Sequence, residues 1–222
     1  MTRTSAPLLR AEALAFGLLA PLTLSVGAGE CVALWGPSGS GKTRLLRALA
    51  DLDPNSGAVW LNNRPREDFP GHEWRRRVAL LPAEAPWWLE SVGEHLATDT
   101  PTAALSALGF ERDVLDWQVN RLSTGEKQRL ALIRLLHPRP VPGAPDTETA
   151  ADPAGEPPPP CVLLLDEPTA NLDTRNTERV EQFLAEQRRQ GRGLLWVSHD
   201  PEQRHRVADR AYTLRDGRME VA

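Results

Sequence analysis

A glycine-rich stretch between an apolar run and a helical pattern carries the clearest chemical signal in this sequence. It reads GPSGSGKT, residues 36–43, and fits the pattern G-x-x-x-x-G-K-[ST]. Glycines let successive backbone N–H groups turn inward into an anion-binding nest, and the N-terminus of the following helix adds partial positive charge there. The Lys42 ammonium can reach β- and γ-phosphates, and the Thr43 hydroxyl can ligate Mg²⁺. We therefore predict a nucleoside-triphosphate cradle rather than a glycine-rich turn before an ordinary helix. The predicted cradle comprises Gly36, Pro37, Ser38, Gly39, Ser40, Gly41, Lys42, Thr43 and Arg44.

Two adjacent acids end a later apolar run, CVLLLDE, residues 161–167. The continuous apolar pattern predicts a buried strand, which delivers both acids to the carboxyl edge of a parallel sheet, where ligands bind in open α/β folds. Because adjacent residues on a strand point in different directions, the two carboxylates can do different work. We assign Asp166 to the metal and Glu167 to the role of general base for an attacking water. The alternative is an exposed acidic strand end, which the phosphate loop disfavours.

Three further stretches complete a recognisable set. LSTGEKQR covers residues 122–129, ANLD covers residues 170–173, and WVSHD contains His199. With these motifs in this order, nearly the whole chain resembles the ATP-binding cassette (ABC) ATPases, the nucleotide-binding subunits of ABC transporters. The resemblance implies hydrolysis of ATP, with Mg²⁺, by a head-to-tail dimer of this chain with itself or with a homologous cassette. Each site would pair one subunit's phosphate loop with the other subunit's signature sequence, residues 122–129.

The resemblance also implies roles for single residues. His199 would hydrogen-bond the γ-phosphate and complete a catalytic set with Glu167 and Lys42. Asp173 would organise contacts across the dimer. Phe16 is the candidate for the aromatic ring that stacks on adenine, and a position in the core is the alternative for it.

The start of the signature sequence has two compatible interpretations. Ser123 followed by Glu126 fits the capping box S-x-x-E before the apolar helix LALIRLL. On the family interpretation, the same helix start directs Ser123, the Gly125 backbone, Glu126 and a positive dipole end at the partner's γ-phosphate. The other motifs favour the functional interpretation.

Two residues depart from the family pattern. The place where the family usually has a glutamine that touches Mg²⁺ falls to Ala83, followed by Glu84. Alanine can neither ligate a metal nor orient water. Thr124 stands where the family usually has glycine, although Gly125 remains. For Ala83, either Glu84 takes over the role of the glutamine or coupling and metal coordination differ in this chain. For Thr124, we expect activity to survive at a reduced rate.

The elements that must position these residues alternate between strands and helices, which predicts a mostly parallel sheet covered on both faces. We expect one α/β domain over 1–222, of the P-loop NTPase type, with an N-terminal antiparallel β region and an inserted helical subdomain over 84–137. Residues 87–136 read as mostly helical. The Pro-rich stretch 138–160 reads as a disordered or extended loop, with a docking site for a polyproline-reading partner as the alternative. After the phosphate loop, a leucine stripe predicts a helix that buries Leu45, Leu46, Leu49 and Leu52.

Composition limits the class of protein. The chain has 222 residues, 41% hydrophobic and 25% charged, which is typical of a soluble globular protein. Its net charge of −4 argues against nucleic acid as a partner. No apolar stretch approaches the roughly 18 residues of a membrane span, and a signal peptide is not expected. Cys31 and Cys161 each open a buried run, and we expect reduced thiols rather than a disulfide. The resemblance to ABC ATPases implies that the GLLWVSH strand lies between the strands of these two cysteines, which would keep the thiols too far apart to bridge.

These patterns lead to one expected function and two rivals. We expect a cytoplasmic ATPase subunit, peripheral on the inner face of the cell membrane, that powers a separate membrane-spanning transporter subunit. The compact chain resembles small bacterial exporter ATPases, including a metal-export type. Residues 86–96 are the expected docking zone, with Trp87 and Trp88 as anchors or, alternatively, as packing inside the helical subdomain. The rivals are a nucleotide-gated switch with weak hydrolysis and a soluble ABC protein without a transport role.

Overall fold

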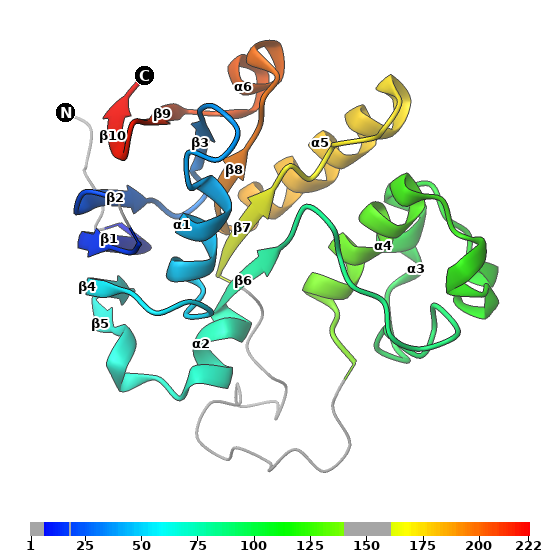
Figure 1. Cartoon of the computed structure of the whole chain (residues 1–222). Coiled ribbons are helices and arrows are strands. Elements are labelled where there is room, and N and C mark those ends of the chain that lie inside the picture. The colour runs from blue at the N-terminus through cyan, green and yellow to red at the C-terminus, as the bar shows by residue number, and fades with distance from the viewer. Residues whose placement is uncertain (1–6, 18, 140–160) are drawn as a thin grey trace. The chain divides into compact units, whose positions relative to one another are not determined.

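The fold was analysed in a computed structural model, which describes residues 7–17, 19–139 and 161–222 (Figure 1). The chain divides into two compact units. The first unit comprises Met1–Leu80, Pro159–Glu167 and Ala185–Ala222, and the second comprises Leu81–Pro158 and Pro168–Leu184. Residues 140–160, which make up most of the Pro-rich stretch, lie outside the described residues.

The larger sheet has six strands in the order β10-β9-β3-β8-β7-β6. Strands β3, β7, β8 and β9 are parallel neighbours, and β10 pairs with β9 in the antiparallel sense. Every residue of β7 and β8 is buried, as the continuous apolar runs predicted. The strands are β3 (Cys31–Trp35), β6 (Val78–Leu81), β7 (Val162–Asp166), β8 (Gly193–Val197), β9 (Arg210–Arg215) and β10 (Arg218–Val221).

The first unit also contains a four-stranded antiparallel sheet in the order β2-β1-β4-β5. Burial alternates along β2, so one face of this sheet turns toward the core and the other is left more exposed. The expected class, an α/β fold with a mostly parallel sheet and an N-terminal antiparallel region, is therefore present. The strands of the antiparallel sheet are β1 (Leu9–Ala15), β2 (Leu22–Val26), β4 (Ser56–Leu61) and β5 (Arg64–Pro65).

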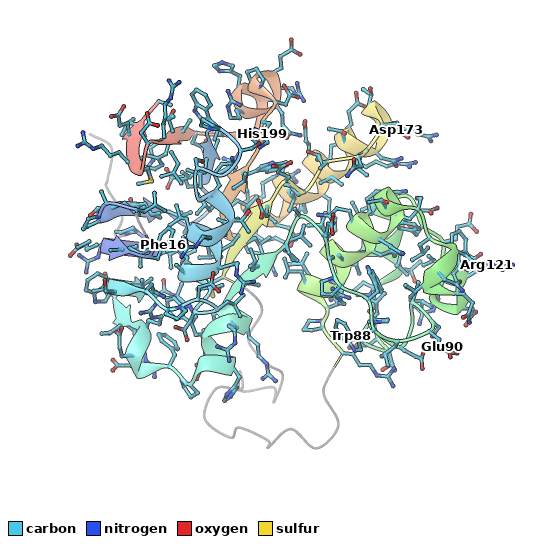
Figure 2. All side chains as sticks on the ribbon, viewed as in Figure 1. Phe16, Trp88, Glu90, Arg121, Asp173 and His199 are labelled. Atoms are coloured by element: carbon cyan, nitrogen blue, oxygen red, sulfur yellow. The ribbon has the colours of Figure 1, made fainter. Side chains whose placement is uncertain are left out.

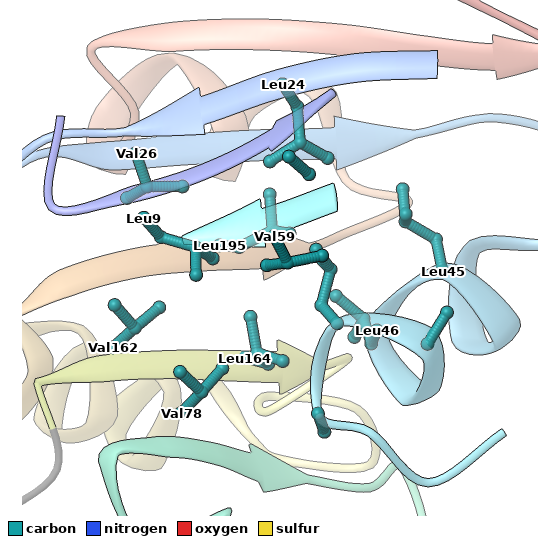
Figure 3. Packing of buried hydrophobic residues seen from close by; sticks show 14 of the residues in the cluster. Leu9, Leu24, Val26, Leu45, Leu46, Val59, Val78, Val162, Leu164 and Leu195 are labelled. Atoms are coloured by element: carbon teal, nitrogen blue, oxygen red, sulfur yellow. The ribbon is translucent and has the colours of Figure 1, made fainter. Parts of the chain in front are cut away.

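One apolar core holds the first unit together. Helix α1 (Lys42–Leu49) buries Leu45, Leu46 and Leu49 completely, because these residues share one face at helical spacing. Figure 3 shows Leu45 and Leu46 beside Val59 and Leu164, so the helix that follows the phosphate loop is fixed by apolar packing. Leu52 does not join this core as the sequence pattern predicted. Helix α1 ends at Leu49, and the side chain of Leu52 is 44% exposed.

The remaining helices are short apart from two. The first unit contains η1 (Arg66–Asp68), α2 (Gly71–Arg77) and α6 (Pro201–Val207). The second unit contains α3 (Thr102–Ala107), η2 (Arg112–Asp116), η3 (Val119–Arg121) and α4 (Thr124–Leu136). Helix α5 (Thr174–Arg189) contributes residues to both units. The sequence predicted a mostly helical 87–136, but 84–101 contains no helix. Prolines at 86 and 101 lack the N–H donor that a helix needs, and the Leu89 and Ser91 N–H groups donate to side chains instead of to a helical carbonyl.

The two cysteines stay apart, as expected from the strand order. Strand β8 lies between β3, which Cys31 begins, and β7, which Cys161 precedes. Neither cysteine forms a disulfide. Burial raises the pKa of the Cys31 thiol to about 12, so this side chain behaves as a core residue. Within residues 7–17, 19–139 and 161–222, no helix is long and apolar enough to cross a membrane.

Candidate active site

The glycine-rich loop connects the end of β3 to the start of α1, where the sequence pattern requires it. Gly36 has φ 150°, and a Cβ there would lie 2.1 Å from the Leu214 carbonyl oxygen. Gly41 has φ 104° and immediately precedes α1, and a Cβ there would lie 2.7 Å from Leu19 Cδ1. Both positions therefore need glycine, for backbone conformation and for space.

Lys42 is folded back over this loop. Its Nζ donates to the Gly36 carbonyl at 2.9 Å and to the Pro37 carbonyl at 3.0 Å, and the residue is only 7% exposed. Burial lowers the pKa of the ammonium, and the carboxylates of Glu167 and Asp166 oppose that shift. An ammonium has three N–H donors, so one remains for an anionic ligand after these two bonds.

The loop also contains polar groups that suit a polyphosphate. Ser40 Oγ is buried and has no hydrogen-bond partner within the described part of the chain. The first N–H groups of α1 have no acceptor within the helix, since a helix leaves its first four donors unpaired. A Cβ at Gly39 would meet no atom within 4 Å, so the loop is open at that point. These groups fit a bound phosphate chain.

Oxygen ligands suited to magnesium meet at the end of β7. The Thr43 hydroxyl donates to Asp166 Oδ2 at 2.7 Å, which brings the two predicted metal ligands together. Asp166 is 3% exposed, and burial raises the pKa of its carboxyl while the Thr43 hydroxyl opposes the shift. No cluster of three or more acidic, histidine or cysteine ligands occurs among the residues described. A small number of protein ligands is consistent with a Mg²⁺ site, because Mg²⁺ is commonly held by one or two carboxylates together with substrate phosphates.

The two residues expected at the reacting end of the nucleotide contact each other. Glu167 Oε1 and His199 Nε2 are 2.9 Å apart, at the carboxyl ends of the neighbouring strands β7 and β8. Their side chains are 35% and 46% exposed, so water can reach them. Glu167 has φ 49°, a conformation that non-glycine residues rarely adopt and that often accompanies function. A carboxylate placed in this way can accept a proton from water, and the imidazole can orient the reacting groups.

The predicted adenine-stacking residue, Phe16, is buried. Phe16 belongs to the apolar core and is 4% exposed, so its ring has little surface to offer a base. The guanidinium of Arg44 lies 5.9 Å from the centre of this ring and against the backbone of Gly17. Figure 2 labels Phe16 on the side of the antiparallel sheet and His199 near α6. The alternative interpretation of Phe16, as a core residue, matches the structure.

The signature sequence begins a helix in the second unit. Ser123 Oγ accepts from the Glu126 N–H at 3.3 Å, and the Ser123 N–H donates to Glu126 Oε2 at 2.8 Å, which completes the predicted capping box at the start of α4. A Cβ at Gly125 would lie 2.9 Å from Leu172 Cδ2. The signature therefore packs closely against Asn171 and Leu172 of the same unit.

A groove of about 600 Å³ lies beside these residues, within the second unit. Thr124 lines it next to Gly125, and Glu84 lines it as well, so the acid that follows Ala83 shares a surface with the signature. The sequence analysis placed Ala83 at the family's glutamine position with Glu84 next to it, and gave no sign that Glu84 lies beside the signature. The groove is lined by Glu84, Ser123, Thr124, Gly125, Glu126, Arg129, Asn171, Leu172, Asp173 and Asn176.

The cap predicts a modest effect on stability. Replacing Ser123 by alanine removes the acceptor for the Glu126 N–H, and we expect the free energy of unfolding to fall by about 1 kcal/mol. Urea denaturation followed by circular dichroism measures this. Ser106→Ala, in α3, is the matched control, since it removes a hydroxyl but no cap. An unchanged Ser123→Ala stability would contradict the capping role.

Comparison with known proteins agrees with this site. The family described as ABC transporter matches residues 19–141. The chain is 37% identical over 202 residues to the aliphatic sulfonates import ATP-binding protein SsuB 3 of Paraburkholderia xenovorans, covering 89% of this chain and 71% of that protein. The chain therefore belongs to the ABC transporter family, as one of its ATP-binding subunits, and it is an ATPase. The resemblance inferred from the motifs is confirmed.

Two solved structures share the fold. A dimeric ATP-binding cassette, MJ0796, bound to ADP and Pi has a TM-score of 0.73 at 22% identity and covers 96% of this chain and 98% of that one. A bacterial Atm1-family ABC exporter with ATP bound has a TM-score of 0.75 at 22% identity, and the match covers 96% of this chain and 38% of the exporter chain. These likenesses confirm the expected α/β class.

Proposed function

We propose that this chain binds Mg-ATP in a head-to-tail dimer and that its hydrolysis powers a separate membrane-spanning transporter subunit. The observation that carries the proposal is the pair of contacts Thr43–Asp166 and Glu167–His199 beside the glycine-rich loop. Lys42, the loop N–H groups and Ser40 would hold the phosphates, and Thr43 and Asp166 would hold Mg²⁺, which supplies charge neutralisation at the phosphates when bound.

The residues of this chain then divide the chemical work. Glu167 orients the attacking water and accepts its proton, while His199 holds the Glu167 carboxylate and reaches the terminal phosphate. In the dimer, Ser123, Gly125 and Glu126 of one copy would face the nucleotide of the other, and Asp173 would lie at the junction. Release of phosphate would let the two copies separate and drive the partner.

The membrane partner is proposed from two observations. The sulfonate relative is named an import ATP-binding protein, and the described residues of this chain contain no spanning helix. A subunit of this kind works at the cytoplasmic face of the membrane, peripheral to its partner. Detergent extraction of native membranes, with the tagged chain as bait, tests this: a membrane protein should co-purify, whereas co-purification of ribosomes or DNA would favour the non-transport alternative.

An exposed apolar surface in the second unit is the proposed docking point. Trp88 is 67% exposed, Leu89 40% and Trp117 39%, and we call these three residues the tryptophan surface. Their segments are joined by a hydrogen bond of 3.0 Å from the Val92 N–H to the Trp117 carbonyl. Large exposed aromatic residues are common anchors in interfaces. We propose a cytoplasmic helix of the membrane-spanning subunit as the occupant.

Replacing Trp88 by alanine tests docking independently of ATP hydrolysis. We expect Trp88→Ala to leave the ATPase rate of the isolated chain within about twofold, because the side chain is far from buried. Stimulation of that rate by the co-purified membrane subunit in proteoliposomes should fall at least about tenfold. Leu52→Ala, another exposed apolar residue, is the control. Full stimulation of Trp88→Ala would contradict the docking surface.

The weakly hydrolysing switch remains a second candidate because two specific positions favour it. Ala83 offers no metal ligand, and Thr124 adds a side chain to the signature groove. Turnover of the purified chain at saturating Mg-ATP distinguishes the two: the enzyme proposal expects multiple turnovers, and the switch expects binding with none.

A further inference from the structure

His95 is a buried histidine that neither the motifs nor the proposed chemistry uses. It is 3% exposed, although it lies directly under the tryptophan surface. The Trp88 and Leu89 N–H groups both donate to its Nε2, at 3.1 and 3.0 Å. Its Nδ1 lies 3.0 Å from the Ser91 carbonyl oxygen, which can only accept. The ring is therefore neutral, with its proton on Nδ1 and Nε2 as the acceptor.

The same ring is packed between aromatic side chains. It meets Trp87 and Trp88 edge to face, with ring centres 4.7 and 4.8 Å apart. The Arg134 guanidinium, from α4, lies 4.6 Å and 4.9 Å from the centres of these two tryptophan rings and donates to the Pro86 carbonyl at 2.7 Å. Residues 86–91 are thus held by hydrogen bonds to His95 and by a hydrogen bond from Arg134, while the side chain of Trp88 stays exposed.

Charged groups around the ring act in opposite directions. Burial has the largest effect and lowers the pKa of His95, the Ser91 carbonyl raises it, Arg134 lowers it and Glu94 raises it. Glu94 is itself tied to the Ser91 N–H at 2.8 Å, and Arg139 donates to the Glu94 carbonyl at 3.1 Å. Because the folded pKa lies below the unfolded one, this histidine supports the segment above its ordinary pKa. That support is lost as the pH falls through the folded pKa.

We propose that His95 is a positioning residue for the tryptophan surface: the neutral ring holds residues 86–91 in the conformation that presents Trp88 and Leu89, and protonation releases them. Protonation turns Nε2 from an acceptor into a donor, so two backbone N–H groups lose their partner and a second cation forms beside Arg134. The surface would then be available to its occupant at neutral pH and lost in acid. The kind of occupant rests on the proposed function; the positioning itself does not.

Nuclear magnetic resonance of the full chain tests the positioning without any partner. Ring ¹⁵N shifts should report the Nδ1–H tautomer at about pH 8 and titration at a pH below the usual value for histidine, about 6.5. In hydrogen exchange, the protection factors of the Trp88 and Leu89 amides should fall at least about tenfold as His95 becomes protonated. A ring that bears its proton on Nε2, or protection that is unchanged across the titration, would overturn the proposal.

Variants separate positioning from general stability. His95→Gln keeps a neutral acceptor near Nε2, so protection of the two amides should persist and lose its dependence on pH. His95→Ala should abolish the protection at every pH, and His72→Gln, at an exposed histidine, should behave as wild type. If His95→Gln retains the wild-type pH dependence, the proposal fails. If all these results hold and Trp88→Ala still leaves partner stimulation intact, the docking function fails and the positioning stands.

Discussion

Replacing Glu167 by glutamine should lower the rate of ATP hydrolysis by about 100-fold to 10,000-fold while leaving ATP affinity nearly unchanged. The reason is local: the carboxylate contacts His199 at 2.9 Å and is open to water, so its first role is toward the attacking water. An amide of the same shape cannot accept a proton from water. Phosphate release at saturating Mg-ATP measures the rate, and titration of ATP measures the affinity.

The same variant tests the dimer. Without hydrolysis, the ATP-bound pair of chains cannot separate by turnover, so Glu167→Gln with Mg-ATP should elute as a dimer in size exclusion. Glu220→Gln, at an exposed acid on β10, should keep wild-type turnover and wild-type elution. A monomeric Glu167→Gln at saturating Mg-ATP would count against the head-to-tail dimer. Turnover equal to wild type would remove Glu167 from the mechanism.

Replacing Lys42 by alanine should weaken ATP binding roughly tenfold to 150-fold, the loss expected for one or two charge-assisted hydrogen bonds. The ammonium is held at the loop by the Gly36 and Pro37 carbonyls, so it is already in place for a phosphate oxygen. Equilibrium dialysis with labelled ATP gives the affinity.

Folding must be checked alongside, because Lys42 is a buried residue. Near-ultraviolet circular dichroism of Lys42→Ala should match wild type, and Arg76→Ala, an exposed cation on α2, should bind ATP normally. Wild-type affinity in a folded Lys42→Ala protein would show that the lysine is not part of the nucleotide site.

Much of the first unit could be predicted because its signals are local. Continuous apolar runs predicted β3, β7 and β8, and the glycine pattern predicted the loop that joins β3 to α1. The contacts Thr43–Asp166 and Glu167–His199 follow once these parallel strands end at one edge, since that edge gathers the residues that follow each strand.

The parts that could not be predicted depend on three-dimensional packing. Phe16 and Leu52 were interpreted from position and spacing, but burial decided both: Phe16 entered the core, and Leu52 fell beyond the end of α1. In residues 88–91, side chains accept from three backbone N–H groups, and the rest of 84–101 forms turns and isolated backbone contacts, so neither a helical nor a strand period describes the segment. The role of His95 could not be predicted from the sequence, because its hydrogen-bond donors are backbone N–H groups, and these leave no pattern of residue types.

Titration calorimetry with Mg-ATP tests the central claim most directly, that the loop amides and Lys42 grip a nucleoside triphosphate. The wild-type chain should bind ATP with measurable heat, and Lys42→Ala should show a loss of affinity of at least about tenfold under the same conditions. If the folded wild-type chain takes up no ATP in the presence of magnesium, the nucleotide site and the ATPase mechanism built on it are wrong.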